Sequence, residues 1–389
     1  MLAFPWVHWV SLALGAALMA PGASPPPPDP SSAGGSSGEV CTVSFQMADP
    51  GDCPAYGPGA RELELRQLGL VPMHPLPILP FDASLGQTTN LSYHALSKSS
   101  QLRVYSTVAD ALSKDAAQIF HKGFVYISVH GQITQSGKIL YTTASGIVRQ
   151  DEVGARVTVS NFHGLAFSQT PSRTFGWVVE STYPSSQPGA GADKSLPWLN
   201  RYTPVQVYET QPVNGLDWYL VGVGQWLDQK KVALVVPDSS PPQGVPADSR
   251  WIRVNLYEQT LAAYDQGQLV FATLTASGLP PWYTRPGLFQ ITKKLDVTPM
   301  SGAFAADRSD YYYLQDVPWV MYYDRARALH GTYWHDGFGY VHSHGCVNLS
   351  IADAHWLYNW TNIGTWVQVY DPSGRTPTDP AFYSNDAGY

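Results

Sequence analysis

Charged residues are scarce in this chain of 389 residues, where they make up only 14%. Lysine and arginine number 23 against 30 aspartates and glutamates, so the net charge is −7. Because phosphate groups are bound by basic surfaces, this balance gives no reason to expect a nucleic-acid partner. The apolar fraction of 44% is that of a globular protein and argues against a wholly disordered chain.

Lysine and arginine are also missing from the N-terminus, where residues 2–20 are almost entirely apolar. Small residues and the proline run at 25–28 follow, so we interpret residues 1–24 as a signal peptide or an N-terminal membrane anchor. This interpretation predicts an extracytoplasmic protein. A buried core helix fits poorly, because a Pro/Gly/Ser-rich linker, expected at 25–65, comes directly afterwards. No other segment approaches the length of a membrane span.

Cysteine is limited to three residues. Cys41 and Cys53 lie close together in the linker, and in an exported protein they can close a small disulfide loop. The alternative is a pair of unpaired surface thiols. One thiol, Cys346, is then left over, and an odd cysteine in an exported protein is a candidate reactive group.

Long helical patterns are rare, because 34 glycines and 32 prolines interrupt the chain and favour short strands. A weak internal repeat predicts two small β-barrel modules, at 100–183 and 198–238, which resemble bacterial SH3-like domains. The proline-rich segment 237–246 marks a domain boundary. The strand candidates of the repeat are, copy by copy, 102–107 with 205–210, 123–129 with 217–223, and 146–148 with 232–236.

Beyond residue 250 the pattern becomes more regular. Alternating apolar and polar residues at 251–257 predict a half-buried strand, and Asp265-Gln266-Gly267 predicts a hairpin turn. Ser350 and Asp353 have the spacing of a capping box at a helix N-terminus. We therefore expect a helix that runs to Trp360, followed by a strand at 366–370.

Histidine and cysteine are concentrated in one glycine-rich segment, whose five members are His330, His335, His342, His344 and Cys346. A thiol near an imidazole indicates nucleophilic catalysis, because the thiolate is the attacking species and the imidazole can take its proton. A glycine before the nucleophile permits a tight turn whose N–H groups face a developing oxyanion. Two alternatives stay open: a zinc site, although the spacings match no closed zinc pattern, and a purely structural role.

The same segment resembles the signature of the L,D-transpeptidase catalytic (YkuD) family. The matching residues are His330-Gly331-Thr332 and, sixteen positions after this histidine, the cysteine of Ser343-His344-Gly345-Cys346-Val347-Asn348. Ser277-Gly278 and residues 284–289 extend the resemblance back towards Trp251, with Arg285 where the family usually has proline. The resemblance implies a mostly β, mixed sandwich-like catalytic domain at 250–371, preceded by the two SH3-like modules.

The resemblance also implies the catalytic roles. Cys346 is the nucleophile and His330 is its general base, oriented by the main-chain carbonyl of Gly331. The N–H groups of Gly345 and Cys346 form the oxyanion hole, while Ser343 and His344 shape the turn.

Substrate contacts are implied at Asn348 and at aromatic residues of a flap that corresponds to residues 303–328. The flap residues expected to line the cleft are Trp319, Met321, Tyr322 and Tyr323, and the alternative for the aromatic ones is plain core packing. His335 and His342 have no counterpart in the family signature, and we interpret them as structural or peripheral.

By the same resemblance, peptidoglycan stem peptides are donor and acceptor, carbapenem-type β-lactams are inhibitors, and the protein is associated with the cell wall. Cys346 would displace D-Ala from the donor, and an amine of a second stem would resolve the thioester, without metal or cofactor. The alternatives are an L,D-carboxypeptidase that hydrolyses the same bond and an inactive wall-binding scaffold.

Overall fold

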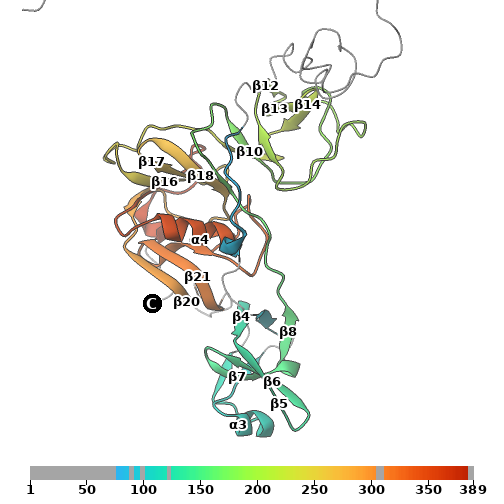
Figure 1. The fold of residues 1–389 in the computed structure, drawn as a ribbon, viewed down its shortest axis with the longest axis vertical. Coiled ribbons are helices and arrows are strands. Elements are labelled where there is room, and N and C mark those ends of the chain that lie inside the picture. The colour runs from blue at the N-terminus through green and yellow to red at the C-terminus, as the bar shows by residue number, and fades with distance from the viewer. Residues whose placement is uncertain (1–75, 87–91, 97–100, 121–123, 304–310, 384–389) are drawn as a thin grey trace, which may run out of the picture. The chain divides into compact units, whose positions relative to one another are not determined.

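The computed structural model describes residues 76–86, 92–96, 101–120, 124–303 and 311–383, all within one compact unit (Figure 1). The expected signal segment, the linker, Cys41 and Cys53 lie outside these residues. Across the described part of the chain, no helix is long and apolar enough to cross a membrane. Strands dominate, as the composition predicts.

Two sheets enclose the main core. Ile252 and Leu261 of one sheet pack with Met321 and Leu329 of the other and with Leu357 of helix α4 (Ile351–Trp360). The six-stranded sheet has the order β19 (Gly287–Gln290), β24 (Trp366–Tyr370), β16 (Arg250–Asn255), β17 (Thr260–Asp265), β18 (Gln268–Leu274) and β9 (Leu165–Ala166).

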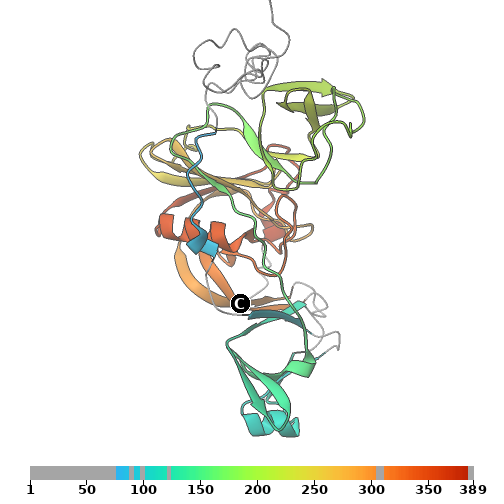
Figure 2. The same ribbon diagram turned by 45° about the vertical axis from the view of Figure 1, so that its right-hand side comes forward.

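The second sheet has seven strands and carries the histidine- and cysteine-rich segment. Its order is β23 (Val347–Leu349), β22 (Arg327–Gly331), β21 (Tyr312–Asp324), β4 (Phe124–Val129), β1 (Ser92–Leu96) and β8 (Val153–Arg156), with β20 (Lys293–Gly302) also paired to β21. Helix α4 packs against β21 and β22 (Figure 1 and Figure 2).

Local signals place the elements after residue 250 where they are expected. Gln266 and Gly267 both have positive φ (50° and 77°), as a two-residue hairpin between right-twisted strands requires. Ser350 caps α4 by accepting the Asp353 N–H at 3.1 Å. The Asp353 carboxylate does not complete the expected capping box, because it accepts the Gly164 N–H at 2.7 Å and the Thr273 hydroxyl at 2.6 Å instead.

The predicted internal repeat yields strands at all six positions, but the two copies pair differently. In the first copy β4 joins the seven-stranded sheet, whereas its counterpart β13 (Leu216–Gly222) pairs with β12 (Glu209–Val213) and β14 (Gln225–Asp228). The SH3-like character of both regions stays a prediction.

The remaining elements form small sheets and short helices outside the two main sheets. They are the β2–β3 pair (Leu102–Val104, Gln118–Phe120), β5–β6–β7 (Gly131–Gln135, Lys138–Thr143, Gly146–Arg149), β11–β10–β15 (Pro204–Gln206, Phe175–Val178, Val232–Val235), helix α3 (Val108–Ser113), and the 3-10 turns η3 (Ala83–Gly86), η4 (Gln150–Glu152) and η5 (Pro380–Tyr383).

One pairing links the first predicted module directly to the catalytic region. Strand β4 runs parallel to β21, with Phe124 opposite Tyr312 and Tyr126 opposite Leu314. Phe124, at the start of β4, therefore lies near the histidine- and cysteine-rich segment.

Candidate active site

Parallel strands β22 and β23 bring the predicted nucleophile and base to one sheet edge. His330 lies on β22 opposite Asn348, and Cys346 immediately precedes β23. Both side chains line a cavity of about 420 Å³. The other residues that line it are Phe124, Trp282, Met300, Tyr311, Tyr312, Leu314, Trp334, His342, Ser343, His344 and Asn348.

His330 is held in one tautomer. Its ring is 2% exposed, and Nδ1 lies 3.1 Å from the main-chain oxygen of Gly331. Since a carbonyl oxygen can only accept, Nδ1 carries the proton and Nε2 is the basic nitrogen. Burial lowers the pKa of His330 to about 4, against a weaker opposing effect of the Gly331 carbonyl. The ring is therefore neutral at pH 7 and able to accept a proton.

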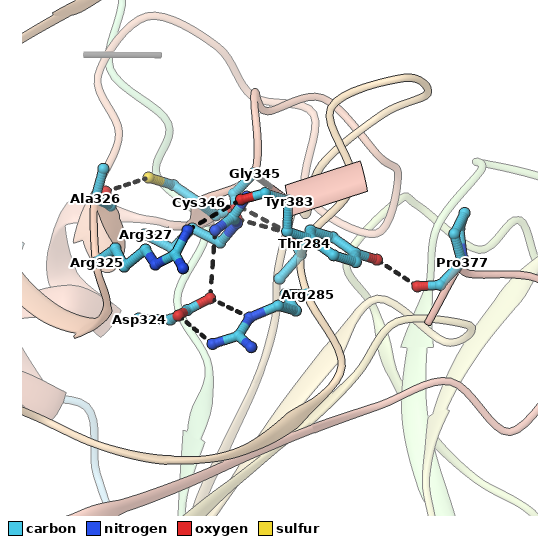
Figure 3. A network of polar contacts seen from close by, with 10 residues as sticks. All are labelled: Thr284, Arg285, Asp324, Arg325, Ala326, Arg327, Gly345, Cys346, Pro377 and Tyr383. Carbon is cyan, nitrogen blue, oxygen red and sulfur yellow. Dashed lines mark hydrogen bonds and ion pairs between the residues drawn. The ribbon is translucent and has the colours of Figure 1, made fainter. Parts of the chain in front are cut away.

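The Cys346 thiol is half-buried and points towards main-chain atoms of β22 and the residue before it. Sγ lies 3.9 Å from the Ala326 carbonyl oxygen (Figure 3). Burial raises the pKa of Cys346, while the Ala328 N–H and the Arg327 guanidinium lower it. Because His330 is also neutral, the resting site holds a thiol and an imidazole rather than the ion pair that a standing thiolate would require.

The turn before the nucleophile is built from side-chain hydrogen bonds. Ser343 Oγ accepts the Gly345 N–H at 3.1 Å and donates to the Cys346 carbonyl at 2.5 Å. Gly345 has φ of +114°, a conformation that favours glycine. The Gly345 N–H, expected to be an oxyanion donor, is directed at Ser343 in this structure.

Thr284 supports the same turn through two further hydrogen bonds. Its hydroxyl accepts the Gly278 N–H at 2.8 Å and donates to the Gly345 carbonyl at 3.0 Å. Thr284 is 1% exposed, so both bonds are made away from water. The match of Thr284 to the family pattern thus has a local physical reason.

His335 and His342 were interpreted from sequence as structural or peripheral, and of the two only His342 is among the residues that line the cavity. His342 lines the cavity, and its ring centroid lies 4.1 Å from that of His335. His335 Nε2 is 2.9 Å from the carboxamide of Asn348, while its Nδ1 accepts the Gly337 N–H at 2.9 Å. Burial is the main cause that lowers the pKa of His335, to about 3, and that lowers the pKa of His342.

The tautomer of His335 decides how Asn348 is oriented. Because Nδ1 accepts a hydrogen bond, the neutral ring carries its proton on Nε2. The Asn348 atom placed 2.9 Å from His335 Nε2 is the amide nitrogen Nδ2, which would set donor against donor. We therefore assign the carboxamide the flipped orientation, in which its oxygen accepts the Nε2 proton. His335 is therefore the group that orients Asn348, and no short-range sequence signal indicates it.

His344 lies between two aromatic rings. Its centroid is 4.4 Å from that of Trp282 and 5.2 Å from that of Tyr312, which begins β21 within the expected flap. Trp282 and Tyr312 both line the cavity, and neither was singled out by the sequence.

The three aromatic residues expected from the flap lie elsewhere. Trp319 stacks on His355 of α4 with ring centroids 3.9 Å apart, and Tyr323 is 3% exposed in the main core. Tyr322 packs in a separate apolar cluster, and none of the three is among the residues that line the cavity. The physical reason is that half of the expected flap forms strand β21, whose second half is covered by the core and by helix α4.

A metal site finds no support in the described part of the chain. There, no three His, Cys, Asp or Glu side chains are grouped so that they could hold a metal ion. The adjacent His335 and His342 are accompanied by Asn348 rather than by a third such ligand.

Comparison with known proteins assigns this region to a family. Residues 249–369 match the L,D-transpeptidase catalytic domain (YkuD). The probable L,D-transpeptidase YbiS of Escherichia coli (strain K12) is 37% identical over 62 residues, which make up 16% of this chain and 20% of that protein. This chain thus spans about a fifth of the length of the curated relative. Residues 249–369 are an L,D-transpeptidase catalytic domain.

Solved structures with a similar fold include two L,D-transpeptidases. The NMR structure of the catalytic domain from E. faecium L,D-transpeptidase is 26% identical and covers 32% of this chain and 98% of that chain, with a TM-score of 0.29. The crystal structure of L,D-transpeptidase from Stackebrandtia nassauensis is 26% identical and covers 33% of this chain and 58% of that chain, with a TM-score of 0.26.

Proposed function

We propose that this chain is a cysteine-dependent L,D-transpeptidase that cross-links peptidoglycan through a thioester on Cys346. The observation that carries the proposal is that His330 on β22 and Cys346, just before the neighbouring parallel strand β23, both line one cavity. A solvent-reachable thiol beside a basic imidazole nitrogen is the minimum that nucleophilic acyl transfer requires.

The first half-reaction would transfer the donor acyl group to sulfur. His330 Nε2 takes the thiol proton as Sγ attacks the carbonyl carbon of the amide that precedes D-Ala. The C–N bond then breaks, His330 returns the proton to the leaving amine, and D-Ala departs. The resulting thioester retains the acyl group of the shortened stem.

The second half-reaction would use an amine of another stem peptide. The amine attacks the thioester carbonyl, its proton passes to His330, and the thiol is restored when the C–S bond breaks. Water in place of the amine gives the carboxypeptidase product. The aromatic cavity wall supports the transfer reaction because it keeps water from much of the thioester surface.

The resting protonation states support a mechanism in which the Cys346 thiolate forms only after substrate has bound. With His330 neutral, its Nε2 lone pair is available at neutral pH, and the thiol proton moves to it only when a bound substrate can be attacked.

We also propose that the protein acts outside the cytoplasm in the cell envelope, where stem peptides occur, and that carbapenem-type β-lactams acylate Cys346.

The test is the product mixture formed by the purified full chain from a stem tetrapeptide, analysed by mass spectrometry. We expect a cross-linked dimer, which H330Q and C346A do not make. H355Q is the matched control, because His355 also lies near a main-chain carbonyl (Leu85, 3.2 Å) but stacks on Trp319 outside the cavity. Release of shortened stem alone would favour the hydrolase, and dimer formation by C346A would refute the proposal.

A further inference from the structure

A cluster of arginines surrounds one buried carboxylate beneath the nucleophile turn. The Asp324 side chain is 3% exposed and lies 2.8 Å from Arg285 Nε and 3.3 Å from Arg327 Nη1 (Figure 3). A second bond joins Arg285 Nη2 to the other carboxylate oxygen. Two guanidinium groups therefore share one negative charge, and the cluster carries a net positive charge.

Arg327 is the member of this cluster that reaches the nucleophile. It lies between Ala326, whose carbonyl oxygen faces Sγ at 3.9 Å, and Ala328, whose N–H also favours the thiolate. A methyl group placed on Gly345 would lie 3.4 Å from Arg327 Nε, so the guanidinium packs against the residue before Cys346. The Arg327 side chain is only 11% exposed, and solvent therefore screens its charge poorly.

A segment beyond the matched domain holds Arg327 in place. The Arg327 guanidinium carbon lies 5.2 Å from the centre of the Tyr383 ring, which is 3% exposed. The Tyr383 hydroxyl donates to the Pro377 carbonyl at 2.5 Å. Arg325 Nη1 donates to the Tyr383 carbonyl at 3.3 Å, so the C-terminal segment is tied down on both sides of the ring (Figure 3).

We propose that Arg327 is the counter-ion of the Cys346 thiolate, held in place by Tyr383 and partly neutralised by Asp324. A fixed cation would ease formation of the thiolate, which burial of both Cys346 and His330 opposes. Arg327 would act through space and not by contact with substrate, so it is a positioning residue. The inference rests on the proposed function for its purpose, but it concerns only the acidity of one thiol.

Other ionisable groups also surround the thiol and must be considered in the test. Those that line the same cavity are His330, His342, His344, Tyr311 and Tyr312. Buried Tyr323 lies behind it, where burial and the charge of Cys346 raise the tyrosine pKa far above its usual range. His330 is neutral at rest, and burial also lowers the pKa of His342. Arg327 is a permanent positive charge packed against the turn.

The experiment measures the rate at which the full chain reacts with iodoacetamide between pH 7 and about pH 11.5, read at Cys346 by peptide mass spectrometry. For R327Q we expect the midpoint of the rate profile to rise by about one pH unit or more, since an opposite charge within about 4–6 Å lowers a pKa by that much. R327K should keep most of the effect. R253Q is the matched control and should leave the midpoint unchanged, because Arg253, 14% exposed and 2.9 Å from Asp238, lies on β16 of the six-stranded sheet.

A second variant separates charge from packing. D324N removes the negative charge that offsets Arg327, so we expect its midpoint to fall below that of the parent, opposite in sign to R327Q. A packing defect would not reverse sign between the two variants. If R327Q fails to fold, the direction seen with D324N decides alone. An unchanged midpoint in R327Q, or an unchanged or raised one in D324N, would overturn the inference, whether or not cross-linking is observed.

Discussion

Thr284 offers a sharp test of how the nucleophile turn is supported. Its hydroxyl joins the Gly278 N–H to the Gly345 carbonyl, with distances of 2.8 and 3.0 Å. T284V keeps nearly the same volume but removes both hydrogen bonds. The turn that presents Cys346 would then lose the hydrogen bond that Thr284 donates to the Gly345 carbonyl.

The magnitude follows from what the substitution leaves behind. Gly278 and Gly345 are both buried, so an N–H donor and a carbonyl acceptor would lose their partner away from water. Each such group costs about 1–3 kcal/mol, and T284V should therefore reduce the free energy of unfolding by about 2–6 kcal/mol. T284S retains the hydroxyl and loses one methyl group, which should cost about 1 kcal/mol.

The assay is urea unfolding of the full-length T284V and T284S proteins beside the parent, with the midpoint and slope fitted together. Alkylation of Cys346 under native conditions gives a second readout of the turn. We expect T284V to be clearly less stable than T284S and its thiol to react at a different rate. Equal stability of the two variants would show that the hydroxyl bonds do not support the turn and would refute this reasoning.

Three further predictions concern glycine and buried ionisable groups. G345A should lower both the free energy of unfolding and the alkylation rate of Cys346, because φ of +114° costs a non-glycine residue about 1–3 kcal/mol. An alkylation rate equal to that of the parent would contradict this prediction. The pKa of His335 is lowered to about 3, so the folded state binds fewer protons than the unfolded state and stability is lost as pH falls from about 6.5; in H335Q, chemical denaturation between pH 4 and 7 should show a weaker loss. Burial raises the pKa of Asp353 to about 6, so the stability that its protonated carboxyl contributes is lost as pH rises through 6. D353N should remove that loss, which changes the pH-dependent part of the unfolding free energy by about 3 kcal/mol. Identical pH profiles of D353N and the parent would argue against a buried ionising carboxyl.

Short-range signals were enough to predict much of the region after residue 250. The two-residue turn at Gln266 and Gly267, the Ser350 cap and the strand at 366–370 each depend on residues a few positions apart. The Cys346 and His330 motif likewise identified the cavity, because a family signature records residues that fold together.

Long-range pairings could not be predicted in the same way. The pattern at Phe124 indicates a strand but does not say that its partner is β21, and the repeat suggested a different partner. The roles of Trp319 and Tyr323 depended on which half of β21 faces the core, which alternation alone does not reveal. The contact of His335 with Asn348 arises only once β22 and β23 are paired.

The electrostatic state of the site also lies beyond sequence reasoning. An imidazole near a thiol suggests a ready ion pair, but burial works against the charged form of both groups. The structure places His330 and Cys346 in surroundings that favour the neutral forms, with a lowered pKa for the first and a raised pKa for the second. Burial of this kind is a property of the assembled sheets and not of the motif.

The central claim is that Cys346 carries the acyl group during turnover. Its most direct test is the intact mass of the full chain quenched with acid during incubation with a stem tetrapeptide, followed by peptide mapping. We predict a mass gain equal to the stem without its terminal D-Ala, less one water, located on the peptide that contains Cys346 and absent from C346A. Turnover without any adduct on that peptide in the quenched enzyme, or the same adduct on C346A, would contradict the account.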